Sequence, residues 1–195
     1  MSDPLEKLFG SSPRLKLLRL FLFNPRQSFT LPEVAQRSRI KEREARRELG
    51  LLLQIQVIKK VRRSARAMGA RYILNDSFRY AGALKHLLLN APERGNDLYE
   101  RVRRAGTIKL FVLAGVFVDE WEERLDILVV GDRINERKLR EGVRRFESEI
   151  GKELRYALLT TDDFFYRLNM NDHLVRDVFD YPHRIIEDKL NIGLK

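Results

Sequence analysis

Apolar residues recur at helical spacing along the first half of the chain. Ser12 followed by Pro13 is a favourable helix start, and the leucine-rich segment after them predicts a helix. That helix should end before Pro25, because the residue preceding a proline avoids helical angles. Thr30 and Glu33 have the spacing of a capping box and predict a second, short helix.

A third helix is predicted from about Lys41 to Ile55, with two contrasting faces. One face is apolar and consists of Ala45, Leu49, Leu52 and Leu53. The opposite face consists of Arg43, Arg47, Gly50 and Gln54, with Arg46 beside them. A basic face of this kind could also be an ordinary solvent-exposed helix face. Glu42 and Arg46 have the spacing of a helix-stabilising ion pair.

A basic β-hairpin is predicted next, from the alternating segments 57–63 and 71–74, and a further amphipathic helix from 78–89. Short helix, turn, basic helix and basic hairpin form the element order of a winged helix-turn-helix. Its second helix enters the DNA major groove, and cations on its wing contact phosphates. The candidate DNA-binding residues are Lys41, Arg43, Arg46, Arg47, Lys60, Arg62, Arg63, Arg66 and Arg71.

Strand and helix patterns alternate in the second half of the chain, which is typical of an α/β domain. Strands are predicted at 108–118, 125–130, 154–159 and 184–187, and helices at 97–104, 135–151, 161–168 and 172–179. Residues 91–97 combine Pro, Gly, Asn and Asp and predict a linker. The predicted fold class is therefore α+β with two domains, 1–90 and 98–195, joined by 91–97.

Charge is divided unevenly between these halves. The 195 residues include 38 Lys and Arg against 28 Asp and Glu, and the first 90 hold 19 of the cations but only 7 of the acids. This asymmetry suggests a polyanion partner for the first half. The absence of cysteine excludes disulfides and thiolate sites, and the three histidines lack ligand-like spacing, so we expect no metal. Neither a membrane span nor a signal peptide is recognisable, so we expect a cytoplasmic protein.

Several strings resemble a bacterial and archaeal family that joins a winged-helix DNA-binding domain to a minimal nucleotidyltransferase-like domain. They are Leu8 to Ser11, Arg14 to Leu22, Asn24-Pro25, Phe29 to Ala35, Arg46 to Leu49, Arg71-Tyr72 and Leu87 to Leu89. The resemblance implies a transcriptional regulator that binds double-stranded DNA through its third helix and wing, often as a homodimer. The first helix and the 78–89 helix are the candidate dimer interface, although their leucines could equally form the core of one chain.

In the second half, the resemblance rests on two strings that depart from the family pattern. Gly115-Val116 stands where the family has Gly-Ser, and Arg124-Leu125-Asp126 stands where it has Asp-x-Asp. In the family, the Gly-Ser loop binds nucleotide phosphates, and the paired carboxylates hold Mg²⁺ for nucleotidyl transfer. Val116 and Arg124 replace two of those residues, so only Gly115 and Asp126 remain.

We therefore expect a catalytically degenerate second domain, with no catalytic residue and no cofactor, that contacts a small ligand, a protein partner or a second copy. The alternative is a nucleotidyltransferase, or a toxin–antitoxin component, that modifies or binds a partner protein. An enzymatic role requires metal ligands from the intervening loop, where Asp119, Glu120, Glu122 and Glu123 are the candidates.

Overall fold

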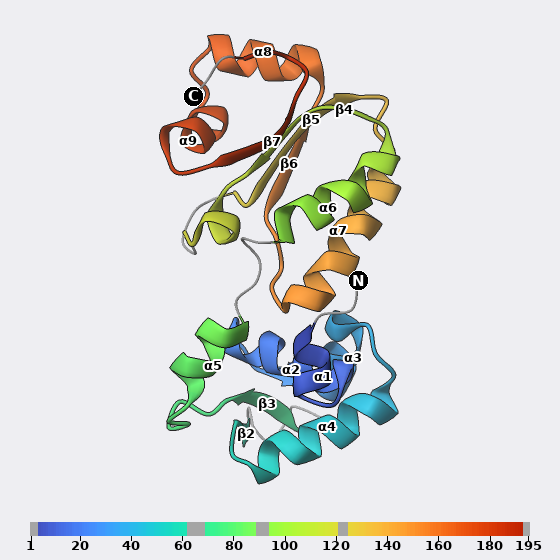
Figure 1. The fold of residues 1–195 in the computed structure, drawn as a ribbon, viewed down its shortest axis with the longest axis vertical. Coiled ribbons are helices and arrows are strands. Elements are labelled where there is room, and N and C mark those ends of the chain that lie inside the picture. The colour runs from blue at the N-terminus through green and yellow to red at the C-terminus, as the bar shows by residue number, and fades with distance from the viewer. Residues whose placement is uncertain (1–3, 62–68, 89–93, 121–124, 193–195) are drawn as a thin grey trace. The chain divides into compact units, whose positions relative to one another are not determined.

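The computed structural model describes residues 4–61, 69–88, 94–120 and 125–192. These residues form a mixed α+β structure with two β-sheets (Figure 1). Contacts divide the chain into two compact units, Met1–Leu89 with Glu147–Lys152, and Asn90–Phe146 with Glu153–Lys195. No helix in the described ranges combines the length and the apolar character that crossing a bilayer requires.

The first unit contains five helices and three short strands among its described residues. They are α1 (Pro4–Leu8), α2 (Ser12–Leu22), β1 (Phe29–Thr30), α3 (Leu31–Ser38), α4 (Glu42–Gln54), β2 (Ile58–Val61), β3 (Arg71–Leu74) and α5 (Ala81–Leu88). The N-cap of α2 is Ser11 rather than the expected Ser12, because Ser11 is extended and its hydroxyl accepts a hydrogen bond from the Arg14 N–H at 3.2 Å. The leucines of α2 are buried within this unit.

The capping box predicted for the second helix is present at α3. Glu33 accepts a hydrogen bond from the Thr30 N–H at 2.7 Å, and Thr30 Oγ1 accepts one from the Glu33 N–H at 3.4 Å. Arg39 then adopts a left-handed conformation and ends the helix. Because α3 and the following turn are fixed in this way, α4 begins at Glu42, close to the predicted start.

The predicted hairpin is an antiparallel pair, β2 with β3, in which Ile58 lies opposite Leu74. The sequence analysis missed β1, which pairs with the other edge of β3 through Phe29 and Tyr72. A strand of two residues leaves no alternation to detect, and this one leads directly into a helix. The sheet order is β1-β3-β2.

The second unit contains a four-stranded sheet of order β6-β5-β4-β7. Its elements are α6 (Gly95–Val102), the 3-10 helix η2 (Arg103–Ala105), β4 (Thr107–Leu113), the 3-10 helix η3 (Gly115–Val118), β5 (Ile127–Asp132), α7 (Glu136–Ile150), β6 (Tyr156–Leu159), α8 (Thr161–Asn169), α9 (His173–Asp180) and β7 (Arg184–Asp188). The last four residues of α7 belong to the first unit. Strand β4 is antiparallel to β5 and β7, and β5 is parallel to β6.

Two predicted boundaries in this unit were wrong. The strand expected over 108–118 ends at Leu113, because Gly115 has φ +52° and turns the chain into η3. Residues 91–93 of the expected linker lie outside the described residues, and the rest of it overlaps α6, which begins at Gly95. A Cβ at Gly95 would lie 2.2 Å from the Leu113 side chain, so this glycine permits close packing.

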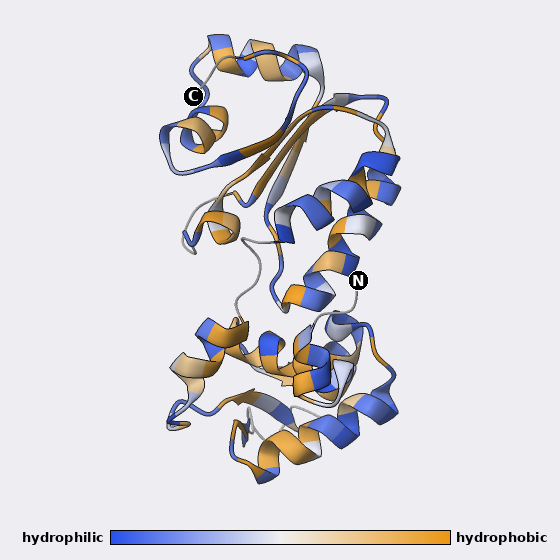
Figure 2. Ribbon diagram, viewed as in Figure 1, coloured by the Kyte–Doolittle hydropathy of each residue, from blue (hydrophilic) through white to orange (hydrophobic). Residues whose placement is uncertain are grey.

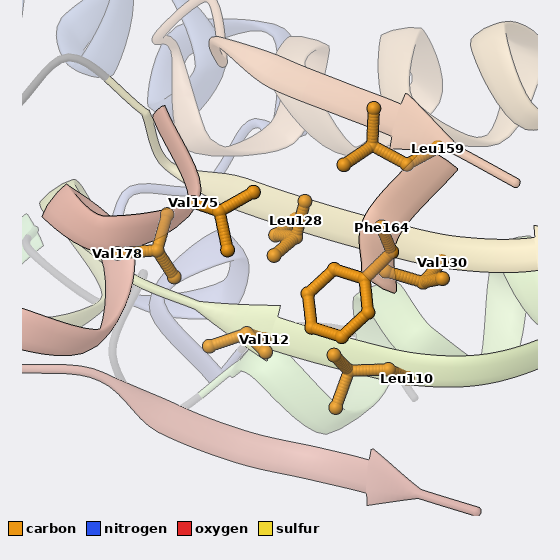
Figure 3. Packing of buried hydrophobic residues seen from close by; sticks show 8 residues of the cluster. All are labelled: Leu110, Val112, Leu128, Val130, Leu159, Phe164, Val175 and Val178. Carbon is orange, nitrogen blue, oxygen red and sulfur yellow. The ribbon is translucent and has the colours of Figure 1, made fainter. Parts of the chain in front are cut away.

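Helices cover both faces of the sheet in the second unit (Figure 1). Figure 3 shows the core on the α8 and α9 side, formed by Leu110, Val112, Leu128, Val130, Leu159, Phe164, Val175 and Val178. On the other face lie α6 and α7, where the Tyr99 ring packs 5.3 Å from the Phe111 ring. Figure 2 shows apolar strands between helices whose outer sides are hydrophilic.

Candidate functional site

The outer face of α4 presents two arginines to solvent. Ala45, Leu49 and Leu52 are buried on its inner face, which directs Arg43 and Arg46 outward. Both arginines are exposed, and neither has an ion-pair or hydrogen-bond partner among the described residues. The Glu42–Arg46 ion pair that the spacing allowed is thus not formed there. Two guanidinium groups one helical turn apart remain available to a ligand.

Lys41 precedes this helix as its N-cap, although its side chain makes no capping hydrogen bond. The Glu44 carboxylate accepts a hydrogen bond from the Lys41 N–H at 3.1 Å, which supplies half of a capping box. The Lys41 side chain is exposed at the end of α4 that also carries Arg43. A phosphate group at this end would meet the Lys41 cation and the positive end of the helix dipole.

Arg47 differs from its neighbours because its guanidinium is bound within the unit. The side chain is 71% exposed, yet its Nη2 donates a hydrogen bond to Glu48 Oε1 at 2.9 Å. Glu48 itself is buried and also accepts hydrogen bonds from Arg14 at 3.0 Å and Ser11 at 3.2 Å. Burial of the Glu48 carboxyl raises its pKa, but the hydrogen bonds from Arg14 and Arg47 outweigh burial and hold the pKa below 4.5.

The sequence analysis did not single out Glu48. Its position three residues after Ala45 places it beside the apolar face of α4, which was the available signal. Because Glu48 joins α4 to the start of α2 through Arg14, it fixes the orientation of the helix that carries Arg43 and Arg46.

The hairpin cations fall into three groups. Lys60 on β2 is exposed and has no ion-pair or hydrogen-bond partner within the described ranges. Arg71 on β3 is engaged internally, with its Nη2 3.1 Å from Glu33 Oε2 and its Nε donating to Ser28 Oγ at 3.0 Å. It thereby joins the sheet to the start of α3. Three further candidates, Arg62, Arg63 and Arg66, lie outside the described residues.

In the second unit, the Asp126 carboxylate accepts hydrogen bonds from four N–H donors of two residues, Val116 and Arg155. Its side chain is fully buried, and Oδ1 accepts a hydrogen bond from the Val116 N–H at 3.1 Å. Oδ2 accepts hydrogen bonds from the Arg155 N–H at 2.8 Å and from Arg155 Nε at 3.2 Å. A Cβ at Gly115 would lie 2.3 Å from Oδ1, so glycine is required for this approach. Asp126 therefore fastens the loop after β4 to the residue before β6.

These contacts do not fit a Mg²⁺ site. Both Asp126 oxygens accept hydrogen bonds from N–H donors, and the Arg155 cation, whose Nε lies 3.2 Å from Oδ2, would repel a divalent metal ion. No group of three or more His, Asp or Glu side chains that could hold a metal occurs within the described residues. Arg124, which the sequence placed beside Asp126, lies outside those residues. Arg155 was missed as the partner because the parallel register of β5 and β6 brings it to Asp126.

Asp132, at the end of β5, is also engaged internally. Lys109 Nζ lies 2.7 Å from its carboxylate, and the Thr161 hydroxyl donates to it at 2.9 Å. The hydrogen bond from Lys109, followed by those from Thr161, lowers the pKa of Asp132 to about 2. Asp132 thus connects β4 and β5 to the first residue of α8.

A cavity of about 290 Å³ lies beside α9 in this unit. It is lined by Ala114, Leu125, Asp172, His173, Leu174, Asp177, Val178, Tyr181 and Pro182. The Asp172 carboxylate also caps α9 by accepting a hydrogen bond from the Leu174 N–H at 3.0 Å. A mainly apolar lining that also includes polar side chains suits a small organic molecule.

Comparison of the chain with family models, with curated proteins and with solved structures finds no match.

Proposed function

We propose that this chain is a DNA-binding transcriptional regulator with a winged helix-turn-helix, in which α4 enters the major groove and the β2–β3 hairpin contacts phosphates. The observation that carries the proposal is the pair Arg43 and Arg46, exposed and unpartnered among the described residues on the outer face of a helix whose inner face is buried. Arginine binds guanine through two parallel hydrogen bonds, which makes it the commonest reader of sequence in that groove.

The neighbouring cations have different roles in this proposal. Lys41 and Lys60 contact phosphates, and Arg47 adds a weaker contact because Glu48 already binds its guanidinium. Arg71 positions the hairpin through Glu33 and Ser28 rather than binding DNA. The expected contacts of Arg62, Arg63 and Arg66 stay predictions for residues beyond the described ranges.

The second unit is proposed to be a nucleotidyltransferase-like domain that has lost catalysis and serves for ligand, partner or dimer contacts. Support comes from Asp126, whose oxygens are saturated by Val116 and Arg155 instead of being open to a metal. The cavity beside α9 is the place for a small ligand. Tight binding of Mg²⁺-ATP, or transfer of a label from ATP to a protein, would contradict this part of the proposal.

A homodimer would suit a regulator of this kind, because a two-fold axis matches a palindromic DNA site. The leucines of α2 are buried within their own unit, which leaves α5 as the better candidate for the interface. Tyr80, just before α5, and Leu87 within it are 58% and 50% exposed.

Selection of genomic duplex fragments by the full-length protein, followed by sequencing, tests the proposal. We expect enrichment of a small set of sites with a shared sequence, and that enrichment should be lost in the Arg43→Gln, Arg46→Gln double variant. A wild-type protein that enriches no fragment would overturn the proposed function.

A further inference from the structure

The charges of the second unit are segregated, although the second half of the chain is close to neutral. From Arg133 to Arg145 the sequence has six Lys and Arg against two Glu. From Thr161 to Lys189 it has four Lys and Arg against seven Asp and Glu. The first segment includes most of α7 and the second includes α8 and α9, which cover opposite faces of the sheet (Figure 1). Cations therefore outnumber acids in the first segment, and acids outnumber cations in the second.

Five cations on or next to α6 and α7 have exposed side chains, and these side chains have no ion-pair or hydrogen-bond partner within the described ranges. They are Arg104, Arg133, Arg137, Lys138 and Arg144, which together are called the α7 cationic surface. Other cations nearby are paired, such as Arg103 with Glu100 at 2.7 Å and Arg145 with Glu141 at 3.0 Å. Glu100 and Glu141 are thus engaged by cations other than these five.

Backbone contacts bring these residues onto one surface. The Asn135 N–H donates to the Ala105 carbonyl at 2.8 Å, and a Cβ at Gly106 would lie 2.7 Å from the Arg133 carbonyl oxygen. These contacts join η2, which holds Arg104, to the loop before α7. Within α7, Arg137 and Arg144 are seven residues apart, so they share a face and are separated by about 10 Å.

Helix stability does not account for the cations at the start of α7. The Asn135 side chain caps the helix by accepting a hydrogen bond from the Lys138 N–H at 3.0 Å. Arg137 and Lys138 therefore occupy the first turn, where a positive charge opposes the helix dipole. Their presence there is better explained by an anionic partner than by folding.

We propose that the α7 cationic surface contacts the phosphate backbone of duplex DNA, and so adds contacts to those that α4 makes. This inference rests on the proposed function of the first unit. A duplex presents one charge per ~1.7 Å of its axis, so the ~10 Å between Arg137 and Arg144 spans about six phosphate charges.

The absence of exposed apolar side chains from this surface indicates the chemistry of its partner. None of the large exposed apolar side chains among the described residues lies on α6, η2 or α7. A protein partner would require an apolar centre in its interface, whereas phosphate contacts require only cations. The contacts of this surface should therefore be independent of DNA sequence.

The test measures the affinity of the full-length protein for a labelled genomic duplex over a range of salt concentrations. The Arg137→Gln, Arg144→Gln double variant should reduce the steepness of log affinity against log salt by about 1 to 2, because each phosphate that a cation neutralises contributes ~0.9. A second pair, Arg104→Gln with Lys138→Gln, should have a similar effect. All four substitutions are of exposed side chains, and removing Arg137 takes a cation from the first turn of α7, so the fold should be retained.

The matched control is Arg176→Gln with Lys189→Gln, which removes the same charge from residues paired with Asp180 and Glu187. This control should leave the salt dependence unchanged. If both α7-surface pairs behave like the control while Arg43→Gln weakens binding, the inference fails and the proposed function survives. If the wild-type protein shows no salt-dependent binding, the proposed function fails as well.

Discussion

The Arg155 guanidinium and the buried Asp126 carboxylate form an ion pair with Nε 3.2 Å from Oδ2. Asp126 also accepts hydrogen bonds from the backbone of Arg155 and of Val116. A carboxylate with these partners stabilises the fold by joining two segments. Asp126 therefore has a structural role in the second unit.

Asp126→Asn should lower the free energy of unfolding by about 2–3 kcal/mol, because the new amide group would face an N–H donor in a buried position. Urea denaturation with and without Mg²⁺ measures this, and we expect Mg²⁺ to stabilise neither protein. Asp162→Asn is the control, since the Asp162 side chain is exposed and has no ion-pair or hydrogen-bond partner within the described ranges. Stabilisation of the wild-type protein by Mg²⁺ that Asp126→Asn abolishes would show that Asp126 binds metal.

Gly50→Ala should raise the free energy of unfolding by about 1 kcal/mol, because alanine favours the interior of a helix. A Cβ at Gly50 would meet no atom within 4 Å. If Gly50 permits close approach of α4 to DNA, the same variant should bind the selected duplex less tightly. Thermal denaturation and a binding titration on one preparation give both readings, and lower thermal stability would show that the glycine is needed by the fold.

Glu48→Gln should destabilise the protein by about 1–3 kcal/mol at neutral pH, because it removes the charge that Arg14 and Arg47 compensate. The pKa of Glu48 is held below 4.5 in the folded chain. Its contribution is therefore complete above that value and is lost as the pH falls through the lowered pKa.

Urea denaturation at pH 7 and at successively lower pH should accordingly show the difference between wild type and Glu48→Gln shrinking below pH 4.5. Glu42→Gln provides the comparison, because Glu42 is exposed and has no partner within the described ranges. A difference that stays constant down to the acid transition would mean that Glu48 titrates normally.

Arg71→Ala should mainly reduce stability, whereas Lys60→Ala should mainly reduce the salt dependence of DNA binding. Arg71 bonds to Glu33 and Ser28, so its loss should reduce stability by about 1 kcal/mol and leave the salt dependence of DNA binding nearly unchanged. Lys60 is exposed, so its loss should reduce the salt slope by ~0.9 and change stability by less than about 0.5 kcal/mol. The assignment of roles would be reversed if Arg71→Ala altered the slope while Lys60→Ala did not.

Strong local sequence patterns, such as a capping box or an apolar helix face, predicted the helices that contain them well. The capping box of Thr30 and Glu33 and the face formed by Ala45, Leu49 and Leu52 predicted α3 and α4 nearly to their ends. These signals act between residues three or four apart, so they can be found in one sequence without tertiary information.

Contacts between distant residues could not be found in this way. Arg155 meets Asp126 only because β5 and β6 pair in parallel, and Arg71 meets Glu33 only because β3 lies beside β1. Two partners of Glu48, Ser11 and Arg14, likewise come from the start of α2. Which cationic side chains lack an internal partner therefore depends on tertiary pairing, which a count of charges does not reveal.

The most direct test of DNA binding by α4 is a salt titration of the full-length protein on a genomically selected duplex. We predict that log affinity falls linearly with log salt at ~0.9 per phosphate contact. Arg43→Gln with Arg46→Gln should weaken binding by about 1–3 kcal/mol for each base that an arginine no longer reads, while Arg176→Gln with Lys189→Gln leaves the affinity unchanged. A flat salt response, or equal affinities for the α4 variant and the control, would contradict the account.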